Sequence, residues 1–179
     1  MRQWQFRSFI ALIVFVVLAG CAGLAPDYPA LLVSADRSDA DRATDKRRNP
    51  VVVVANRPFD DPLPPEARNL DLVVFNFAYH DTANMNVDRS KMNRAIFDAL
   101  KSGGTYIVAD HSGLAGTGTS ETKTLHRIEE AAVRREVESA GFRFVSEGGF
   151  LRNPQDTRTV PSGKNTVPND EFVLKFVKP

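Results

Sequence analysis

The sequence predicts an α/β fold with a mostly parallel sheet, because a helix, a glycine turn and a buried strand follow one another in residues 92–110. Apolar residues recur at helical spacing as far as Leu100, and Gly103 can take the left-handed conformation that ends a helix. Residues 106–109 are then apolar without alternation, as in strands that are covered on both faces. This order of elements is typical of layered α/β proteins.

The N-terminus has the pattern of an exported lipoprotein. Two arginines precede an apolar run at residues 9–20, which is shorter than the ~20 residues that span a bilayer. Leu-Ala-Gly-Cys, ending at Cys21, matches the lipobox of bacterial lipoproteins. Cleavage before Cys21 would leave this residue at the N-terminus, where a diacylglycerol on its thiol would anchor the chain in the cell envelope, facing the periplasm. The alternatives are a membrane-anchor helix and an ordinary signal with a stray cysteine.

Charge and cysteine content limit the partners. The whole chain has 23 basic and 22 acidic residues, and no basic face is clustered, so we predict no nucleic-acid partner. Cys21 is the only cysteine, which excludes an internal disulfide. We divide the chain into a signal at residues 1–20, a proline-containing tether at 21–33 and one domain at 34–179.

The other elements of the domain follow from apolar periodicity and from proline and glycine positions. Residues 34–48 predict a polar helix, and residues 51–55 and 70–77 predict buried strands on either side of a proline-rich connection. A loop that could act as a lid is predicted at residues 112–122, followed by a helix at 128–140 that Gly141 caps. A strand at 142–146 and a long loop at 147–170 come next. The last predicted element is a strand at 171–177, which pairs antiparallel with the strand before it.

Several segments carry a family resemblance. Leu-Lys-Ser-Gly-Gly at residues 100–104, before a strand, resembles the Leu-Lys-Pro-Gly-Gly turn of class I S-adenosylmethionine-dependent methyltransferases, with Ser102 in place of proline. The order of elements matches the C-terminal half of that fold. Five shorter segments are similar to an exported methyltransferase-like family of bacteria: residues 79–81, 110–111, 125–128, 151–154 and 172–176. The resemblance implies a partial Rossmann-like methyltransferase fold with a C-terminal antiparallel strand pair, and S-adenosylmethionine as the methyl donor to an unknown substrate.

One part of the family pattern is missing. Val51, which resembles the start of the family's third strand, follows Pro50 directly, and no glycine-rich turn follows an N-terminal strand. Such a turn is needed because only glycine lets the backbone approach a bound cofactor closely. The sequence resembles the family with its first two strand–helix units removed, by a genomic deletion or by a gene-model error. The strand at residues 70–77 then has an unpaired edge unless residues 51–55 pair beside it. We therefore expect a weakened sheet, an unstable protein or a homodimer that completes the sheet.

Two acid–histidine pairs are the candidate catalytic residues. His80-Asp81 and Asp110-His111 follow strands that should be neighbours, and open α/β sheets bind ligands at the carboxyl ends of their strands. His80 or His111 could take a proton from a methyl acceptor, or the four residues could simply cap the strand ends. Sequential pairs are not a ligand-spacing signature, so we predict no metal site. For His126 a structural role is favoured.

By family position, five residues would contact the cofactor. Asn76, Phe77 and Tyr79 would line the cofactor crevice, and Arg57 and Asp60 would approach the adenine. Two functions follow as hypotheses. The first is a methyltransferase-family lipoprotein, and the second is a non-catalytic envelope lipoprotein that uses the remaining half of the fold for binding.

Overall fold

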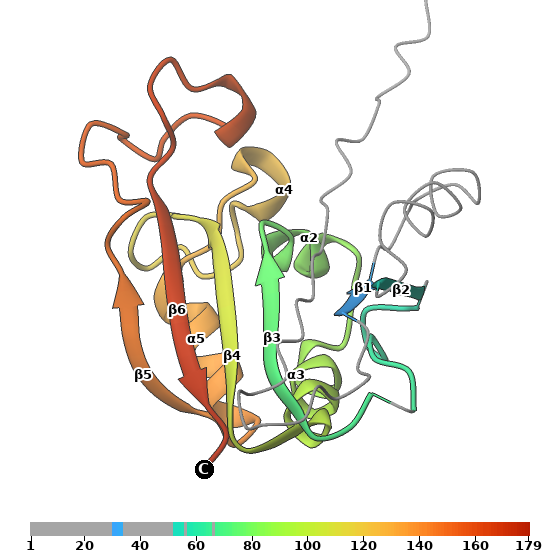
Figure 1. Ribbon diagram of the computed structural model, residues 1–179. Coiled ribbons are helices and arrows are strands. Elements are labelled where there is room, and N and C mark those ends of the chain that lie inside the picture. Colours follow the sequence, from blue (N-terminus) through green and yellow to red (C-terminus); the bar gives the residue numbers. More distant parts are fainter. Residues whose placement is uncertain (1–29, 34–51, 56, 66) are drawn as a thin grey trace, which may run out of the picture.

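The computed structural model describes residues 30–33, 52–55, 57–65 and 67–179. Its centre is a four-stranded sheet in the order β3-β4-β6-β5 (Figure 1). β3 pairs parallel with β4, and β6 pairs antiparallel with both β4 and β5. The strands are β3 (Leu70–Asn76), β4 (Leu100–His111), β5 (Arg143–Gly148) and β6 (Glu171–Val177). The α/β class and the C-terminal antiparallel pair are confirmed, and the pair includes the strand that lies next to β4.

A second, two-stranded sheet lies upstream in the chain. β1 (Ala30–Val33) pairs parallel with β2 (Val52–Ala55). The strand expected at residues 51–55 therefore exists. Its hydrogen-bonded partner is β1, which is formed by the last four residues of the segment expected to be a tether. β3 has no ladder partner other than β4 in the described part of the chain. The signal segment, Cys21 and the polar helix expected at residues 34–48 lie outside the described residues.

Helices cover one face of the four-stranded sheet, where α3 and α5 lie side by side (Figure 1). Asp88 caps α3, because its carboxylate accepts a hydrogen bond from the Lys91 N–H at 3.0 Å. None of the described helices is long and apolar enough to cross a lipid bilayer. The helices are α2 (Tyr79–Asn84), α3 (Arg89–Ala99), α4 (Thr122–Leu125), α5 (Glu130–Ser139) and the 3₁₀ helix η1 (Ser162–Lys164) within the long loop.

The glycine turn differs from the prediction. α3 ends at Ala99, and Gly103, with φ of 77°, lies inside β4 instead of capping the helix. The register between β3 and β4 shifts here, and the Gly103 N–H donates to the Lys178 carbonyl at 2.8 Å. Lys178 also donates from Nζ to the carbonyl oxygens of Phe97 and Leu100, at 2.8 and 2.7 Å, so the C-terminal segment satisfies the backbone groups at the end of α3. Gly141, with φ of 106°, does end α5 as predicted.

The core lies between the sheet and its helices. Alternate strand residues are fully buried there, among them Phe75, Tyr106, Val108 and Leu174. Ile107, between two of them, is only half-buried. Within the described residues α3 and α5 pack on the same face of the sheet, which is why burial of β4 is uneven between its two faces there.

Candidate functional site

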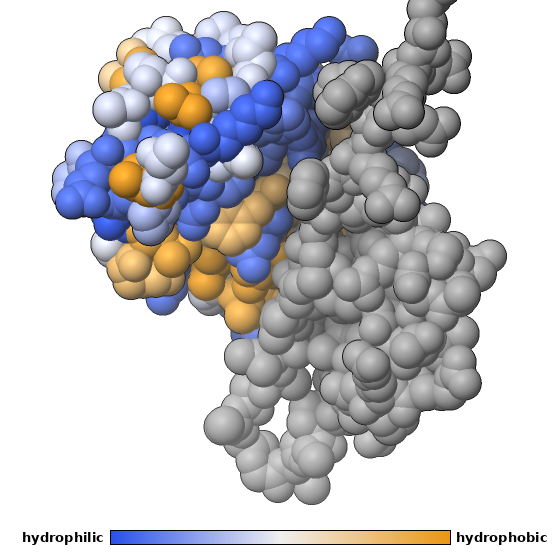
Figure 2. Space-filling view, turned by 90° about the horizontal axis from the view of Figure 1, so that it is seen from above, coloured by the Kyte–Doolittle hydropathy of each residue, from blue (hydrophilic) through white to orange (hydrophobic). Residues whose placement is uncertain are grey.

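The candidate site lies where β3 and β4 end. α2 begins at Tyr79, just after β3, and β4 ends at His111. All three histidines of the chain meet here, with ring centroids 5.7 Å apart for His80 and His111 and 5.5 Å apart for His80 and His126. Seen from above, this side of the described part is mainly hydrophilic (Figure 2). The structure thus brings both predicted acid–histidine pairs together at the predicted edge of the sheet.

Asp110 is the buried centre of this cluster. Its Oδ1 lies 2.7 Å from Nδ1 of His80, and its Oδ2 accepts the backbone N–H of His80 at 2.8 Å. The backbone N–H of His111 also donates to Oδ1, at 2.8 Å. A fully buried carboxylate needs such partners, since an unpaired buried charge is strongly destabilising. Asp110 therefore fixes both the position of His80 and the orientation of its ring.

The electrostatics of the cluster favour a protonated His80. Burial alone would lower the pKa of His80, but the charge of Asp110 and hydrogen bonds to Asp110 and Asp81 outweigh it and raise the pKa to about 10. For Asp81, burial acts to raise the pKa, yet the hydrogen bond and charge of His80 lower it overall, with help from His126 and His111. At neutral pH His80 is therefore an imidazolium between two carboxylates.

His111 is held differently. Its ring stacks on Phe77, with centroids 5.2 Å apart and an interplanar angle of 28°. Its Nδ1 is buried and lies 3.0 Å from Oε1 of Glu171, but makes no hydrogen bond within the described residues. Glu171 faces His111 because the two residues pair across the β4–β6 ladder. Sequence reasoning missed Glu171, which only the placement of β6 beside β4 could have shown.

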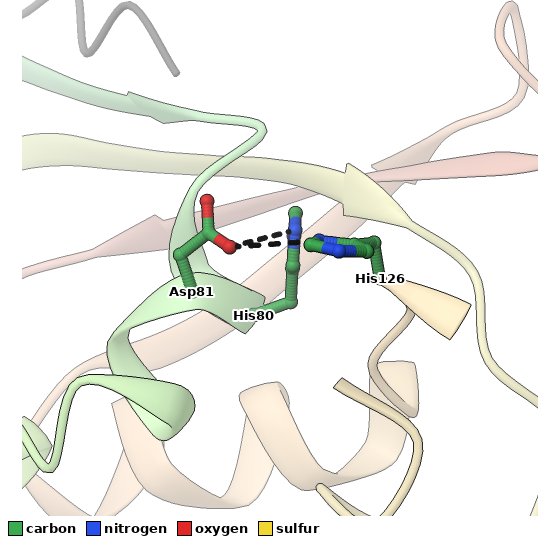
Figure 3. A group of neighbouring side chains, drawn as sticks. All are labelled: His80, Asp81 and His126. Carbon is green, nitrogen blue, oxygen red and sulfur yellow. Dashed lines mark ion pairs between the residues drawn. The ribbon is translucent and has the colours of Figure 1, made fainter. Parts of the chain in front are cut away.

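His126 belongs to the cluster as well, which the sequence did not favour. It follows α4 in the left-handed conformation, with φ of 51°, and its Nδ1 lies 3.8 Å from Oδ1 of Asp81. Asp81 Oδ1 in turn lies 3.2 Å from Nε2 of His80. Figure 3 shows the three side chains directed toward one another, His80 and Asp81 from α2 and His126 from the turn after α4. Its signals in the sequence were that it is one of only three histidines and that it lies in residues 125–128, one of the segments that carry the family resemblance.

A buried arginine fixes the segment that carries His126. Arg127 and Asp156 are both fully buried and form an ion pair of 2.9 Å. Arg127 also donates to the carbonyl oxygens of Val160 and Ser112, at 2.9 and 3.1 Å. Asp156 accepts the backbone N–H of Asp170 at 2.7 Å. The long loop at residues 147–170 is therefore tied to the site by buried polar contacts.

Comparisons with known proteins agree with this architecture. A scan against models of protein families finds no match, and a search of curated proteins finds none either. A chain from the complex of the Haloferax volcanii Trm112 activator with a methyltransferase matches with a TM-score of 0.60 and 16% identity, over 85% of this chain and 73% of that one. The S-adenosylmethionine-dependent methyltransferase of Mesorhizobium loti matches with a TM-score of 0.56 and 12% identity, over 84% of this chain and 80% of that one. The N-methyltransferase NodS of Bradyrhizobium japonicum matches with a TM-score of 0.59 and 12% identity, over 84% of this chain and 74% of that one.

This chain has the class I methyltransferase fold. The comparison extends over most of the chain, whereas sequence identity is low, so the agreement lies in the arrangement of elements. Open α/β sheets in general bind ligands outside the carboxyl ends of their strands. The histidine cluster lies at that edge of this sheet.

The residues assigned to the cofactor of the methyltransferase fold do not all lie together. Arg57 and Asp60 line a pocket of about 330 Å³, whose other walls are Pro58, Phe59 and residues 85–88. Asn76 and Phe77 lie at the end of β3, as expected. Tyr79 lies apart from them: its ring is fully buried against Phe75, and its hydroxyl donates to Glu136 at 2.9 Å and accepts from Asn93 at 2.8 Å. Since α2 begins at Tyr79, this side chain turns into the core.

The described glycines of the 112–122 loop contact the chain itself. The N–H groups of Gly116 and Gly118 donate to the Glu129 carboxylate, at 3.1 and 2.9 Å. A side chain on Gly113 would meet the backbone of Ile128 at 3.0 Å. These close approaches serve packing within the protein. The N–H groups of Gly116 and Gly118 are thus already used within the protein, and this loop provides no cradle for the methionine end of S-adenosylmethionine.

Proposed function

We propose that this protein is an exported, lipid-anchored member of the S-adenosylmethionine-dependent methyltransferase family, and that its histidine cluster contacts the methyl acceptor. The observation that carries the proposal is the His80–Asp110 pair, with His111 beside it, at the carboxyl ends of β3 and β4 in a chain with this fold. Solved structures with the same arrangement include S-adenosylmethionine-dependent methyltransferases. The substrate site would then lie in the polar surface around the cluster.

The three histidines would have different tasks. His80 is protonated at neutral pH, because its pKa is about 10, so it would not remove a proton; with its two nitrogens beside Asp110 and Asp81, it would hold Asp81 in position next to the methyl acceptor. His111 would act as the base through its other ring nitrogen, because its buried Nδ1 lies 3.0 Å from Oε1 of Glu171, which would stabilise an imidazolium. Bound S-adenosylmethionine would supply an electrophilic methyl group, and Arg57, Asp60, Asn76 and Phe77 would hold its adenosine end.

Calorimetric titration of the folded protein with S-adenosylmethionine and S-adenosylhomocysteine tests this proposal. We expect both to bind and Asp60→Ala to weaken both, since Asp60 lines the pocket. Glu138→Ala is a matched control, because this exposed carboxylate on α5 pairs with Arg134 and does not line the pocket. A folded protein that binds neither compound would exclude the methyltransferase activity.

A non-catalytic binding protein is the second candidate. The contacts of Gly116 and Gly118 with Glu129 favour it, because they leave these N–H groups unavailable to a cofactor. In that case the cluster would bind an envelope ligand without turnover. The same titration distinguishes the candidates, since a binding protein would remain folded and show no affinity for S-adenosylmethionine.

We also propose that Cys21 carries the lipid anchor in the cell envelope, on the periplasmic side. The support is the lipobox that ends at Cys21. In cells labelled with palmitate, the protein should be labelled and should sediment with membranes. Cys21→Ser should lose the label, and a wild-type chain without label would contradict the assignment.

A further inference from the structure

We propose that His80, Asp81 and His126 together bind one divalent transition-metal ion (Figure 3). Each residue offers one ligand atom, and these atoms all lie within 4.8 Å of one another. Two imidazole nitrogens and one carboxylate oxygen form a ligand set that zinc and non-haem iron use in proteins. The proposal does not depend on the methyltransferase function, because it requires only these three side chains.

The distances suit an ion of this size. Nε2 of His80 lies 3.2 Å from Oδ1 of Asp81, and Nδ1 of His126 lies 3.8 Å from the same oxygen. Metal–ligand bonds of ~2.0–2.2 Å in a tetrahedral site place neighbouring ligands ~3.3–3.6 Å apart. Since the ligand atoms lie within 4.8 Å of one another, the exposed His126 ring would move closer to the other two residues when the ion binds. The ion would take the place of the proton between His80 and Asp81.

Asp110 orients the His80 ring as a metal ligand. It lies 2.7 Å from Nδ1 of His80, on the opposite side of the ring from Asp81. Metal-binding histidines commonly donate their second nitrogen to a carboxylate in this way, which fixes the tautomer and orients the ligand atom. Nε2 of His80 is thereby directed toward Asp81 and His126.

The backbone on both sides of the site is fixed. The backbone N–H of His80 donates to Asp110, which holds the first turn of α2 in place. His126 is followed by Arg127 and Ile128, both fully buried, and the Ile128 N–H donates to the carbonyl of His111 at 3.1 Å. His126 is therefore held near Asp81 by its neighbours, although its own ring is exposed.

Burial decreases from one ligand to the next. The side chains of His80, Asp81 and His126 are 5%, 29% and 55% exposed. Solvent would reach the ion from the His126 side. Three protein ligands leave a coordination position for water or for an oxygen of a small molecule, as in catalytic metal sites.

Metal titration of the full chain tests the proposal. The protein is purified without a polyhistidine tag, stripped with a chelator and titrated with Zn²⁺ by calorimetry and with Co²⁺ by visible absorption. A Cys21→Ser background removes the only thiol that could bind the metal. We expect one ion per chain and Co²⁺ bands typical of low coordination number. Folded protein that binds neither ion would overturn the proposal.

Variants identify the ligands. His126→Ala and Asp81→Ala change exposed or half-exposed side chains, so they should fold normally and lower Zn²⁺ affinity by at least ~10-fold; Asp110→Asn should lower it by ~10- to 100-fold through the orientation of His80. His111→Gln is the matched control, because it removes a neighbouring histidine that is not a ligand, and it should retain affinity. Equal affinity in His126→Ala and wild type, or equal losses in His126→Ala and His111→Gln, would contradict the assigned ligand set.

Discussion

Nδ1 of His80 lies 2.7 Å from Oδ1 of Asp110, and this contact joins the first turn of α2 to the end of β4. Both side chains are buried, so the pair is poorly screened by solvent. Removing one partner of a buried ion pair typically costs ~3–5 kcal/mol. We expect Asp110→Asn to lower the free energy of unfolding by about this amount, measured in urea without metal. Asp98→Asn, in an exposed pair with Arg94, should cost less than ~1 kcal/mol; equal losses would contradict the role of the buried pair.

The same pair predicts a pH dependence of stability. The pKa of His80 is raised from 6.5 to about 10 in the folded protein, so folding favours the protonated form. This stabilisation is fully present below pH 6.5 and is lost as the pH rises through about 10. Urea unfolding of wild type and His80→Gln should show the largest difference near the acidic end of this window and a smaller one at its alkaline end. A difference that grows toward alkaline pH would contradict the assigned charge state.

Arg127 should be essential for the stability of the long loop. Arg127→Met keeps much of the side-chain volume but leaves Asp156 buried without its cation. We expect a loss of ~3–5 kcal/mol in the free energy of unfolding. Hydrogen exchange should also rise across residues 147–170, since Asp156 holds the backbone N–H of Asp170. Arg134→Met, at an exposed pair on α5, provides the control and should leave exchange in that loop unchanged.

Gly104 should be irreplaceable for a steric reason. An added Cβ would meet the carbonyl oxygens of Lys101 at 2.8 Å and Leu70 at 2.9 Å, and neither backbone atom can move without disturbing the β3–β4 ladder. We expect Gly104→Ala to cost ~1–3 kcal/mol in thermal or urea unfolding. Gly149→Ala meets no atom within 4 Å and should change stability by less than ~0.5 kcal/mol. A neutral Gly104→Ala would show that this approach is looser than described.

The edge of β3 predicts self-association, and hence a homodimer. β3 pairs only with β4 in the four-stranded sheet of the described chain, and an apolar strand edge is a template for pairing. Sedimentation should show a mass that rises with protein concentration, and Leu72→Lys should shift it toward the monomer. Ser146→Lys, on β5 at the opposite edge of the sheet, should leave the mass unchanged. A monomer at all concentrations would contradict the prediction.

Sequence patterns alone were enough for much of the local structure. The strand at residues 171–177 and the helix before Gly141 were predicted closely, because apolar periodicity and glycine positions depend on nearby residues. The two acid–histidine pairs were found for a related reason: polar residues that follow buried strands must lie at the same edge of a sheet. The family resemblance led to the methyltransferase fold, which the solved structures confirm.

The tertiary structure decided what depends on contacts far apart in the chain. It placed β6 between β4 and β5, which brought Glu171 to His111, and it turned Tyr79 into the core. It also brought His126 to Asp81, because the buried Arg127–Asp156 pair fixes that segment. Such relationships arise from burial and from long-range ion pairing, which leave no periodic trace in the sequence. The sequence by itself determined the strands of the four-stranded sheet, α3, α5 and the edge where the two acid–histidine pairs gather, whereas β1, α2 and α4 were not predicted.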